Sequence, residues 1–415
     1  MRIIIAFSIL FVAVIKLCLG LLVALYRQQP VTIYTQSLLG QGGRPIDVKI
    51  FKASNKPLAN VDLWFHYVKG DFNLIGPKAL TMQEAQALTK DQRIRFEVAP
   101  GLITPHDVKR NSGIAHENER VCAIDFVENA GFARRTQILM AAIFQRMIGN
   151  SAKGLPESDV IKLFDVQLDN MTMKSAVNAI MHRVAHRHSS DCAGQFSFVN
   201  ADCVNKYVKD PMYRKVLNSS ERVFADGIGV RMAARWNQTK LKDNVNGTDL
   251  FPLLCQKLAD KQTKVFLYGG RTEVVQKVAI KMKRQFPGLK VVGALDGYSH
   301  SECPKLVTQA INESQAELVF VALGAPLQEH WIDQNKALLN ANAAIGVGGL
   351  FDFYSGSVSR APEWVREFSM EWVWRLCAQP KDKAKRYLIG NPLFLARVVL
   401  SSNSDQHHVG SMEVS

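Results

Sequence analysis

The chain has 415 residues, 47% of them hydrophobic, and a formal net charge of +14. This length allows two or three domains, and the composition is that of a globular protein with a large core. The positive charge predicts an anionic partner, but no zinc-finger spacing or aromatic-basic platform is present, so nucleic acid is the least favoured partner. The seven cysteines are scattered without a CxxC pair, which favours reduced thiols in the cytosol over a disulfide scaffold.

The N-terminal segment is apolar and long enough to cross a bilayer. Residues 3–25 contain two polar residues, one of them Lys16, and are flanked by Arg2 and Arg27; a crossing takes about 20 residues. No small-residue cleavage site follows, so residues 1–27 are predicted to be a membrane anchor and not a cleaved signal peptide. The Lys/Arg-rich body is expected on the cytoplasmic side, and Lys16 leaves a re-entrant helix open as well as a full span.

Residues 28–112 have the pattern of a small α+β domain. Apolar and β-branched residues alternate on both sides of a Gly-rich turn in residues 29–53, which predicts two strands. Residues 82–90 have helical spacing.

The order of these features resembles the membrane-associated bacterial sugar-phosphate transferases, which load a phosphosugar onto polyprenyl phosphate. The resemblance rests on a Gly-Asp-x-x-Leu-Ile-Gly-Pro stretch at 70–77 and a Pro-Gly-x-x-Thr stretch at 100–104. Where that family has an Asp-Glu pair, this chain has Ala59 and Asn60, and Lys78 replaces an Arg. Covalent phosphosugar exchange needs a carboxylate nucleophile. The region is therefore interpreted as an inactive relative that serves as a membrane and lipid-phosphate platform; a plain anchor with an unrelated small domain is the alternative.

Residues 113–159 are predicted to connect this region to the next domain. They contain one stretch with helical spacing, residues 130–148. Its Arg134, Arg135 and Arg146 fit either lipid headgroups or a solvated helix face.

Residues 160–358 alternate apolar runs with segments of helical period. This alternation predicts an α/β fold, a Rossmann-like parallel sheet with helices on both faces. The apolar runs are residues 196–199, 223–225, 265–268, 291–292, 318–323 and 344–347.

Polar residues follow several of these predicted strands, at the edge where open α/β sheets bind ligands. Asn200 and Asp226 follow the first two runs. Spacing alone favours Asp226 as a helix N-cap over a catalytic group. Gly269-Gly270-Arg271 can hold a diphosphate on backbone N–H groups or be only a tight turn. Gln328 has an amide suited to sugar hydroxyls, whereas Glu329 fits a charge favoured by the helix dipole.

Residues 359–400 are predicted to be a basic, amphipathic helical appendage, followed by a disordered tail, residues 401–415. From Arg360 to Arg397 the chain has eight Lys/Arg and four Asp/Glu. Such a segment can lie on an anionic bilayer or close over a phosphate. The chain has no DxD pair to hold a metal against a nucleotide diphosphate, so neither a metal nor another cofactor is predicted.

Together, these motifs resemble the WecG/TagA/CpsF glycosyltransferases from about Leu163 to Val398. The motifs that carry the resemblance are Asn200, Ala225–Val230, Asn246–Leu250, Val265–Gly270, Gly324–Glu329, Gly348–Asp352, Arg360–Pro362 and Glu371–Leu376.

This resemblance implies an inverting, metal-independent transfer of an N-acetylmannosamine-type or related sugar, from a UDP donor to polyprenyl-diphosphate-linked GlcNAc, in bacterial surface polysaccharide synthesis. Asp226 would be the general base that takes the proton from the acceptor hydroxyl. The implied partners are the UDP-sugar, the lipid-linked acceptor and the anionic surface of the bacterial inner membrane, and a homo-oligomer is left open. The substrate-binding residues predicted on this basis are Asn200, Asn246, Gly247, Thr248, Gly269, Gly270, Arg271, Gln328, Arg360, Arg375 and Lys385.

Two residues depart from the family pattern. Phe198 stands where a Thr is usual, and Asn244 stands where an Arg is usual. The expected substitutes for the lost hydroxyl and cation are Ser197, Lys242 or Arg271. These departures leave two other hypotheses: a catalytically impaired scaffold or lipid-phosphate-binding protein of a polysaccharide assembly complex, and a phosphoglycosyl transferase that works through the N-terminal half.

Overall fold

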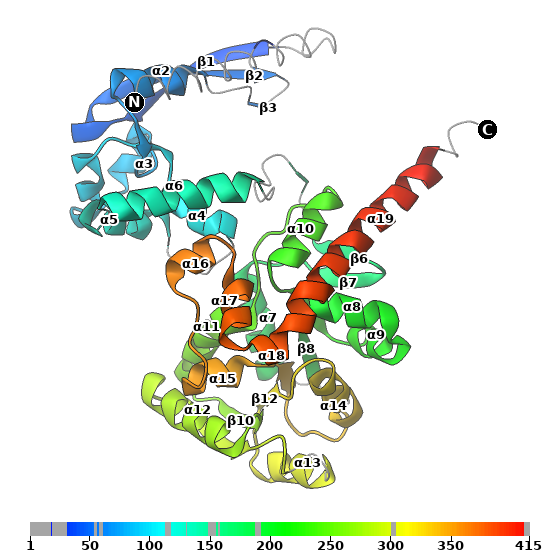
Figure 1. Ribbon diagram of the computed structural model, residues 1–415. Coiled ribbons are helices and arrows are strands. Elements are labelled where there is room, and N and C mark those ends of the chain that lie inside the picture. The colour runs from blue at the N-terminus through cyan, green and yellow to red at the C-terminus, as the bar shows by residue number, and fades with distance from the viewer. Residues whose placement is uncertain are drawn as a thin grey trace. The chain divides into compact units, whose positions relative to one another are not determined.

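The computed structural model of the chain divides into two compact units, residues 1–154 and 155–415 (Figure 1). The described residues are 18, 31–53, 56–57, 61–112, 118–129, 131–147, 155–156, 158–186, 192–299 and 304–410, with backbone alone for 53, 56–57, 147, 304 and 402–410. The predicted anchor lies, Cys18 aside, outside these ranges. Within them, no helix is both long and apolar enough to cross a membrane.

The first unit contains short strands and several helices, which give it a small sheet region. Its strands are β1 (Val31–Leu39), β2 (Pro45–Ala53), β3 (Lys56–Pro57), β4 (Asn73–Ile75) and β5 (Gly101–Ile103). Its helices are α2 (Val61–Lys69), α3 (Met82–Gln86), α4 (Pro105–Ser112), α5 (Glu119–Asn129) and α6 (Phe132–Met147), with 3-10 turns η1 (Gln41–Gly43) and η2 (Asp91–Glu97).

The two predicted strands around the Gly-rich turn form an antiparallel hairpin, β1 with β2, as the alternation indicated. Gly42 and Gly43 have φ values of 69° and 74° in the turn, a conformation that glycine adopts without strain. Two glycines of the resemblance, Gly76 and Gly101, meet where β4 and β5 pair, and a Cβ on Gly101 would lie 2.0 Å from the Gly76 nitrogen. Both positions therefore require glycine for backbone packing alone.

The second unit is built on an eight-stranded sheet in the order β11-β10-β12-β13-β8-β9-β7-β6. All neighbours are parallel except the β6–β7 hairpin. Every predicted apolar run coincides with a strand, although runs 318–323 and 344–347 extend one residue past theirs, so the predicted parallel sheet is confirmed. The strands are β6 (Val160–Leu163), β7 (Val166–Asp169), β8 (Gly194–Val199), β9 (Arg222–Ala225), β10 (Lys264–Gly269), β11 (Lys290–Leu295), β12 (Leu318–Ala322) and β13 (Ala343–Gly346).

Helices cover both faces of this sheet because alternate strand residues enter opposite cores. Leu267 packs with α7, α11, α12 and α15, whereas Phe266 and Tyr268 pack with α13 and α14. Helices α8, α9, α10 and α19 cover the β9–β6 end of the sheet. The first helices of this unit are α7 (Met173–Ala185), α8 (Ala201–Lys209), α9 (Pro211–Asn218), α10 (Ile228–Trp236), α11 (Gly247–Asp260), α12 (Thr272–Gln285), α13 (Pro304–Glu313), α14 (Leu327–Asn335) and α15 (Leu350–Ser355).

The predicted appendage folds as α16 (Glu363–Glu367), α17 (Glu371–Ala378), α18 (Pro380–Ala384), the π-helix η3 (Lys385–Gly390) and α19 (Asn391–Gly410). Helix α19 lies beside α8 and α10, with Phe394 and Val398 buried against them (Figure 1). It runs to residue 410, into the stretch for which a disordered tail was predicted. Asn205 of α8 fixes the segment, because it donates to the Gly390 carbonyl (2.7 Å) and accepts from Arg397 (2.7 Å).

Candidate active site

Asn200 and Asp226 lie side by side at the carboxyl edge of the sheet. Strands β8 and β9 are parallel neighbours with Val199 opposite Ala225, so the next residue of each strand leaves the sheet at the same level. The Asp226 backbone N–H donates to the Val199 carbonyl at 2.9 Å. The sequence prediction that these two polar residues converge is confirmed.

The side-chain oxygen and the side-chain nitrogen of Asn200 make hydrogen bonds to different parts of the site. Its side-chain oxygen caps α8, accepting from the backbone N–H groups of Asp202 (3.1 Å) and Cys203 (3.3 Å). Its side chain also hydrogen-bonds the Asp226 carboxylate, for which only the amide nitrogen can be the donor. Asn200 thus ties the position of Asp226 to the start of a helix.

Asp226 is not a helix cap, contrary to what its spacing alone favoured. Gly227 occupies the N-cap position of α10 with φ of 93°, and no side chain caps this helix. The Asp226 side chain is partly exposed. Its surroundings raise its pKa above the usual range, mainly through burial, while Arg375, Arg386 and the Asn200 hydrogen bond oppose the shift. The residue therefore keeps some exposed surface, at a site that makes its carboxyl a better proton acceptor.

Cations from the C-terminal segment surround Asp226. Arg375 of α17 donates to Glu371 (2.9 Å) and lies 4.5 Å from the centre of the Phe353 ring. Arg386 of η3 lies 3.8 Å from Asp202. Burial lowers the pKa of Lys383, and the positive charges of Arg386 and Arg375 lower it further. Three positive groups thus share one small region.

Sequence reasoning identified Arg375 and missed its two neighbours. It proposed Lys385, which is exposed, whereas Lys383 and Arg386 face the region of Arg375. Helical spacing gave no signal for them, because α17 ends at Ala378 and Gln379 is non-helical, so Arg375, Lys383 and Arg386 lie on three successive elements.

The glycines after β10 form a tight turn at the same edge. Gly269 and Gly270 have φ of 119° and 69°, and a Cβ on Gly269 would lie 2.5 Å from the Ala322 carbonyl oxygen. Arg271 follows at the N-cap position of α12. Its charge acts on Asp352, whose pKa is raised by burial and lowered by Lys383 and Arg271. The turn therefore has both a close-packed backbone and a cation, and its diphosphate-binding role stays a prediction.

Gln328 joins two loops of the edge. Its side-chain oxygen accepts from the backbone N–H groups of Gly324 (3.2 Å) and Gly348 (2.8 Å), and its nitrogen donates to Glu329 (2.7 Å). The residue is buried. In this conformation the side-chain amide is hydrogen-bonded within the protein. Gln328 therefore holds the loops after β12 and β13 together. Its direct contact with a sugar stays a prediction.

Glu329 has no exposed surface, and its second carboxylate oxygen has no hydrogen-bond partner within the described structure. Burial raises its pKa to about 7, against the lowering effect of the Gln328 hydrogen bond. Glu329 lies in the first turn of α14, as the helix-dipole interpretation expected, but the carboxyl is fully buried there.

Asn246 and Arg360 meet at the buried Asp249. Asn246 caps α11 by accepting from the Asp249 N–H (2.8 Å), and its side chain donates to the Asp249 carboxylate (2.8 Å). Arg360 forms an ion pair with the same carboxylate. These two predicted ligand-binding residues thus hold the start of α11 against the C-terminal segment. Thr248 is partly exposed beside them.

The structure shows the contacts of Phe198 and Asn244, the two residues that depart from the family pattern. Phe198 is buried against Phe224, with 5.5 Å between ring centres, and its ring borders Gly247. Asn244 accepts a 2.6 Å hydrogen bond from the Gly227 N–H. Among the expected substitutes, Ser197 is buried and bonded to Ser220 (3.2 Å), and Lys242 pairs with Asp159 (2.6 Å). Arg271 remains at the carboxyl edge.

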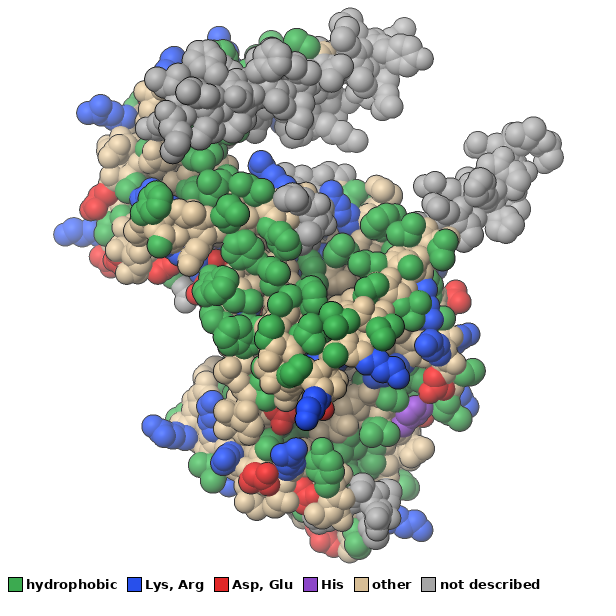
Figure 2. All heavy atoms as spheres, in the orientation of Figure 1, with side chains coloured by type: hydrophobic (Ala, Val, Ile, Leu, Met, Phe, Trp, Pro, Cys, Tyr) green, Lys and Arg blue, Asp and Glu red, His purple; other side chains and the backbone are tan. Residues whose placement is uncertain are grey.

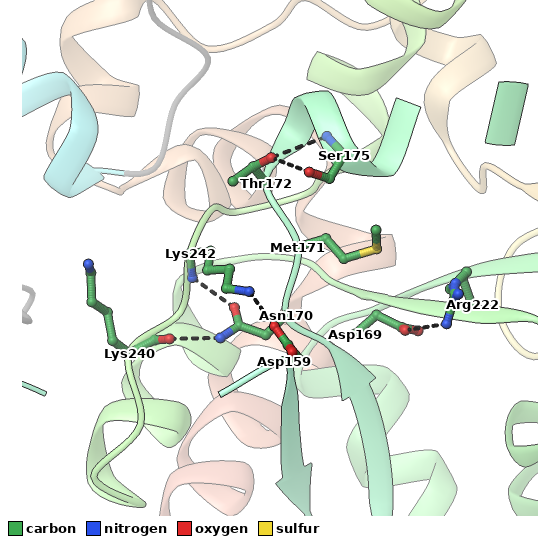
Figure 3. Close-up of a pocket in the computed structure, with 9 residues that line it drawn as sticks. All are labelled: Asp159, Asp169, Asn170, Met171, Thr172, Ser175, Arg222, Lys240 and Lys242. Carbon is green, nitrogen blue, oxygen red and sulfur yellow. Dashed lines mark hydrogen bonds and ion pairs between the residues drawn. The ribbon is translucent and has the colours of Figure 1, made fainter. Parts of the chain in front are cut away.

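A separate pocket of about 590 Å³ contains none of the predicted site residues (Figure 3). Its charged groups pair with one another, Lys242 with Asp159 and Arg222 with Asp169 (3.0 Å). It is lined by Asp159, Asp169, Asn170, Met171, Thr172, Ser175, Arg222, Lys240 and Lys242. Across the described residues, no group of three or more His, Cys, Asp or Glu side chains is placed to hold a metal ion.

Comparison with known proteins assigns the second unit to a family. The sequence model of the "Glycosyl transferase WecG/TagA/CpsF family" matches residues 161–408 and leaves the N-terminal unit unassigned. Two relatives carry the name N-acetylglucosaminyldiphosphoundecaprenol N-acetyl-beta-D-mannosaminyltransferase. The one from Bacillus subtilis strain 168 is 37% identical over 184 residues, 44% of this chain and 71% of the relative. The one from Bacillus spizizenii strain W23 is 34% identical over 208 residues, 50% of this chain and 79% of the relative. The chain belongs to the WecG/TagA/CpsF family of glycosyltransferases.

Proposed function

We propose that this glycosyltransferase moves an N-acetylmannosamine-type sugar from a UDP donor to polyprenyl-diphosphate-linked GlcNAc, with Asp226 as general base. The names of the two relatives supply the donor sugar and the acceptor. The observation that carries the proposal is the position of Asp226, a partly exposed residue that lies outside a helix cap and beside a group of cations.

The proposed reaction uses Asp226 and the C-terminal cations in one displacement. Asp226 accepts the proton of the acceptor hydroxyl while that oxygen attacks the anomeric carbon, and the bond to the UDP oxygen breaks with inversion. Negative charge then develops on the diphosphate. Arg375, Lys383 and Arg386 are the groups placed to neutralise it, because preorganised charges stabilise a leaving group most effectively where water is scarce.

The proposed location is the cytoplasmic face of the bacterial inner membrane. The C-terminal segment exposes Leu388, Ile389 and Leu400 by 60%, 62% and 70%. Figure 2 shows hydrophobic side chains over this part of the second unit, with Lys and Arg side chains beside them. Apolar residues next to positive charges are typical of surfaces that bind anionic bilayers. The predicted anchor and the lipid-phosphate platform of the first unit belong to this proposal.

A donor screen tests the proposal. Purified full-length protein in anionic vesicles is offered UDP-sugars one at a time with a synthetic polyprenyl-diphosphate-GlcNAc acceptor, and release of UDP is measured. UDP-N-acetylmannosamine should give acceptor-dependent release. Asp260→Asn, which changes an exposed carboxylate of α11, should leave that release unchanged. If no UDP-sugar is consumed, the scaffold hypothesis replaces the enzymatic one.

A further inference from the structure

The turn that carries Asp226 is held from two directions. On one side, the Asp226 N–H donates to the Val199 carbonyl (2.9 Å). On the other, the Gly227 N–H donates to the side-chain oxygen of Asn244 (2.6 Å). Helix α10 has no side-chain cap of its own, so Asn244 supplies an acceptor from a distant part of the chain to the first residue after Asp226. Partly buried backbone N–H groups need such a partner.

Asn244 comes from a segment that is itself fixed. Asn170, which is almost fully buried, accepts from the Lys242 N–H (2.8 Å) and donates to the carbonyls of Lys240 (2.8 Å) and Ser158 (2.6 Å). Figure 3 shows Asn170 between Lys240 and Lys242. Asp243 accepts from the Met173 N–H (2.8 Å). The acceptor that Asn244 offers is therefore anchored to β7 and α7, so it does not move with α10.

We infer that Asn244 is a positioning residue: its side-chain oxygen fixes the Asp226–Gly227 peptide and so sets the direction in which the Asp226 carboxyl faces the acceptor hydroxyl. This inference rests on the proposed role of Asp226 as base. Gly227, with φ of 93°, joins Asp226 to the helix through a conformation that leaves the peptide free to rotate once the hydrogen bond is lost. Misplacement of a reacting group by about 1 Å can cost about 100-fold in rate.

The Asn244→Ala variant removes the acceptor. We expect kcat for sugar transfer to fall about 10- to 100-fold, with the KM for the UDP-sugar changed less than about twofold, because the carboxyl and not the donor site is displaced. The matched control is Asn312→Ala. Asn312 makes the same kind of bond, accepting from the Asn340 N–H (2.7 Å), but it belongs to α13. It should lose a similar amount of thermal stability and keep its kcat.

The Asn244→Asp variant separates positioning from general loop stability. It keeps an oxygen acceptor for Gly227 and adds a negative charge near Asp226, which raises the pKa of that carboxyl. We expect kcat to recover at high pH, with the acidic limb of its pH profile moved upward. The charged groups already in place are Arg375, Glu371 and Arg386 around Asp226, and Asp243, the chain neighbour of Asn244, which interacts with Arg231.

The outcomes separate the inference from the function on which it rests. Wild type, Asp226→Asn, Asn244→Ala and Asn244→Asp are assayed together for release of UDP in the presence of the acceptor. Full kcat in Asn244→Ala, while Asp226→Asn is inactive, overturns the positioning role and leaves the base assignment intact. No recovery of kcat in Asn244→Asp at any pH also overturns it. Full activity in Asp226→Asn would instead overturn the proposed base.

Discussion

Two carboxyl groups at the same edge of the sheet differ in how deeply they are buried and in which groups surround them. Asp226 follows β9, lies outside its helix and stays partly exposed among Arg375 and Arg386. Glu329, in the first turn of α14, has no exposed surface and meets the neutral amide of Gln328. Burial raises the pKa of both.

The difference lies in what each group can reach. Asp226 has access to a substrate and to positive charges that can stabilise a transferred group. Glu329 instead holds Gln328, which binds the loops after β12 and β13 through Gly324 and Gly348. A raised pKa at a strand end therefore does not identify a base by itself; accessibility decides between the two carboxyls.

Among the residues around Asp226, the largest effect is expected from Arg375→Ala. Loss of one preorganised charge at a developing anion typically costs about 100- to 1,000-fold in kcat. Because Arg375 also lowers the pKa of Asp226, the acidic limb of the kcat profile should move to higher pH. UDP release at a series of pH values measures both. Lys381→Ala, which removes an exposed charge from the same segment, is the control and should leave kcat nearly unchanged. If Arg375→Ala had only a small effect on kcat and left the acidic limb of the pH profile in place, Arg375 would not act on Asp226 or on the leaving group.

The raised pKa of the buried Glu329 predicts that the stability of the folded protein depends on pH. Because the folded protein holds this proton more tightly than the unfolded chain, stability is highest below about pH 4.5 and falls as pH rises toward 7, where the folded group titrates. A shift from 4.5 to about 7 corresponds to at most about 3 kcal/mol. Urea unfolding of Glu329→Gln should show less of this decline than wild type.

Glu313→Gln is the matched control for Glu329. Glu313 is a helix residue that accepts from Gln309 (2.8 Å) at an exposed site, so its variant should keep the wild-type pH dependence. An identical decline in wild type and Glu329→Gln would show that Glu329 is ionised normally in the folded protein.

The smallest effect is expected from Asn200→Ala. Loss of an N-cap costs about 0.5–2 kcal/mol of stability. Loss of the hydrogen bond to Asp226 raises the pKa of the carboxyl further, so the acidic limb of kcat/KM should move upward. Asp210→Ala is the control, because Asp210 caps α9 through Met212 (2.9 Å) and Tyr213 (3.2 Å). It should lose stability without moving the limb. Equal pH profiles in Asn200→Ala and Asp210→Ala would show that Asn200 acts only as a helix cap.

The sequence was sufficient for the sheet and for the meeting of Asn200 with Asp226. Parallel strands end at one edge, so residues that follow neighbouring strands converge whatever the details of packing. Spacing alone favoured a helix cap for Asp226, which is wrong because Gly227, with φ of 93°, takes the N-cap position of α10.

Tertiary contacts determine the remaining parts of the site. Nothing local indicates that Arg360 pairs with Asp249, 111 residues away, or that Asn244 receives the Gly227 N–H. In the first unit, α5 was not predicted. Its apolar residues are spread around the helix, and only Cys122, Ala123 and Phe126 are buried. Without an apolar stripe, periodicity gives no signal.

The most direct test compares Asp226→Asn with Glu329→Gln in one assay. Both variants replace a carboxyl by an amide of the same shape at the same edge of the sheet. Transfer from UDP-N-acetylmannosamine to polyprenyl-diphosphate-GlcNAc should fall about 100- to 10,000-fold in Asp226→Asn, the range for loss of a general base, and should stay within about tenfold of wild type in Glu329→Gln. Undiminished transfer by Asp226→Asn would contradict the account.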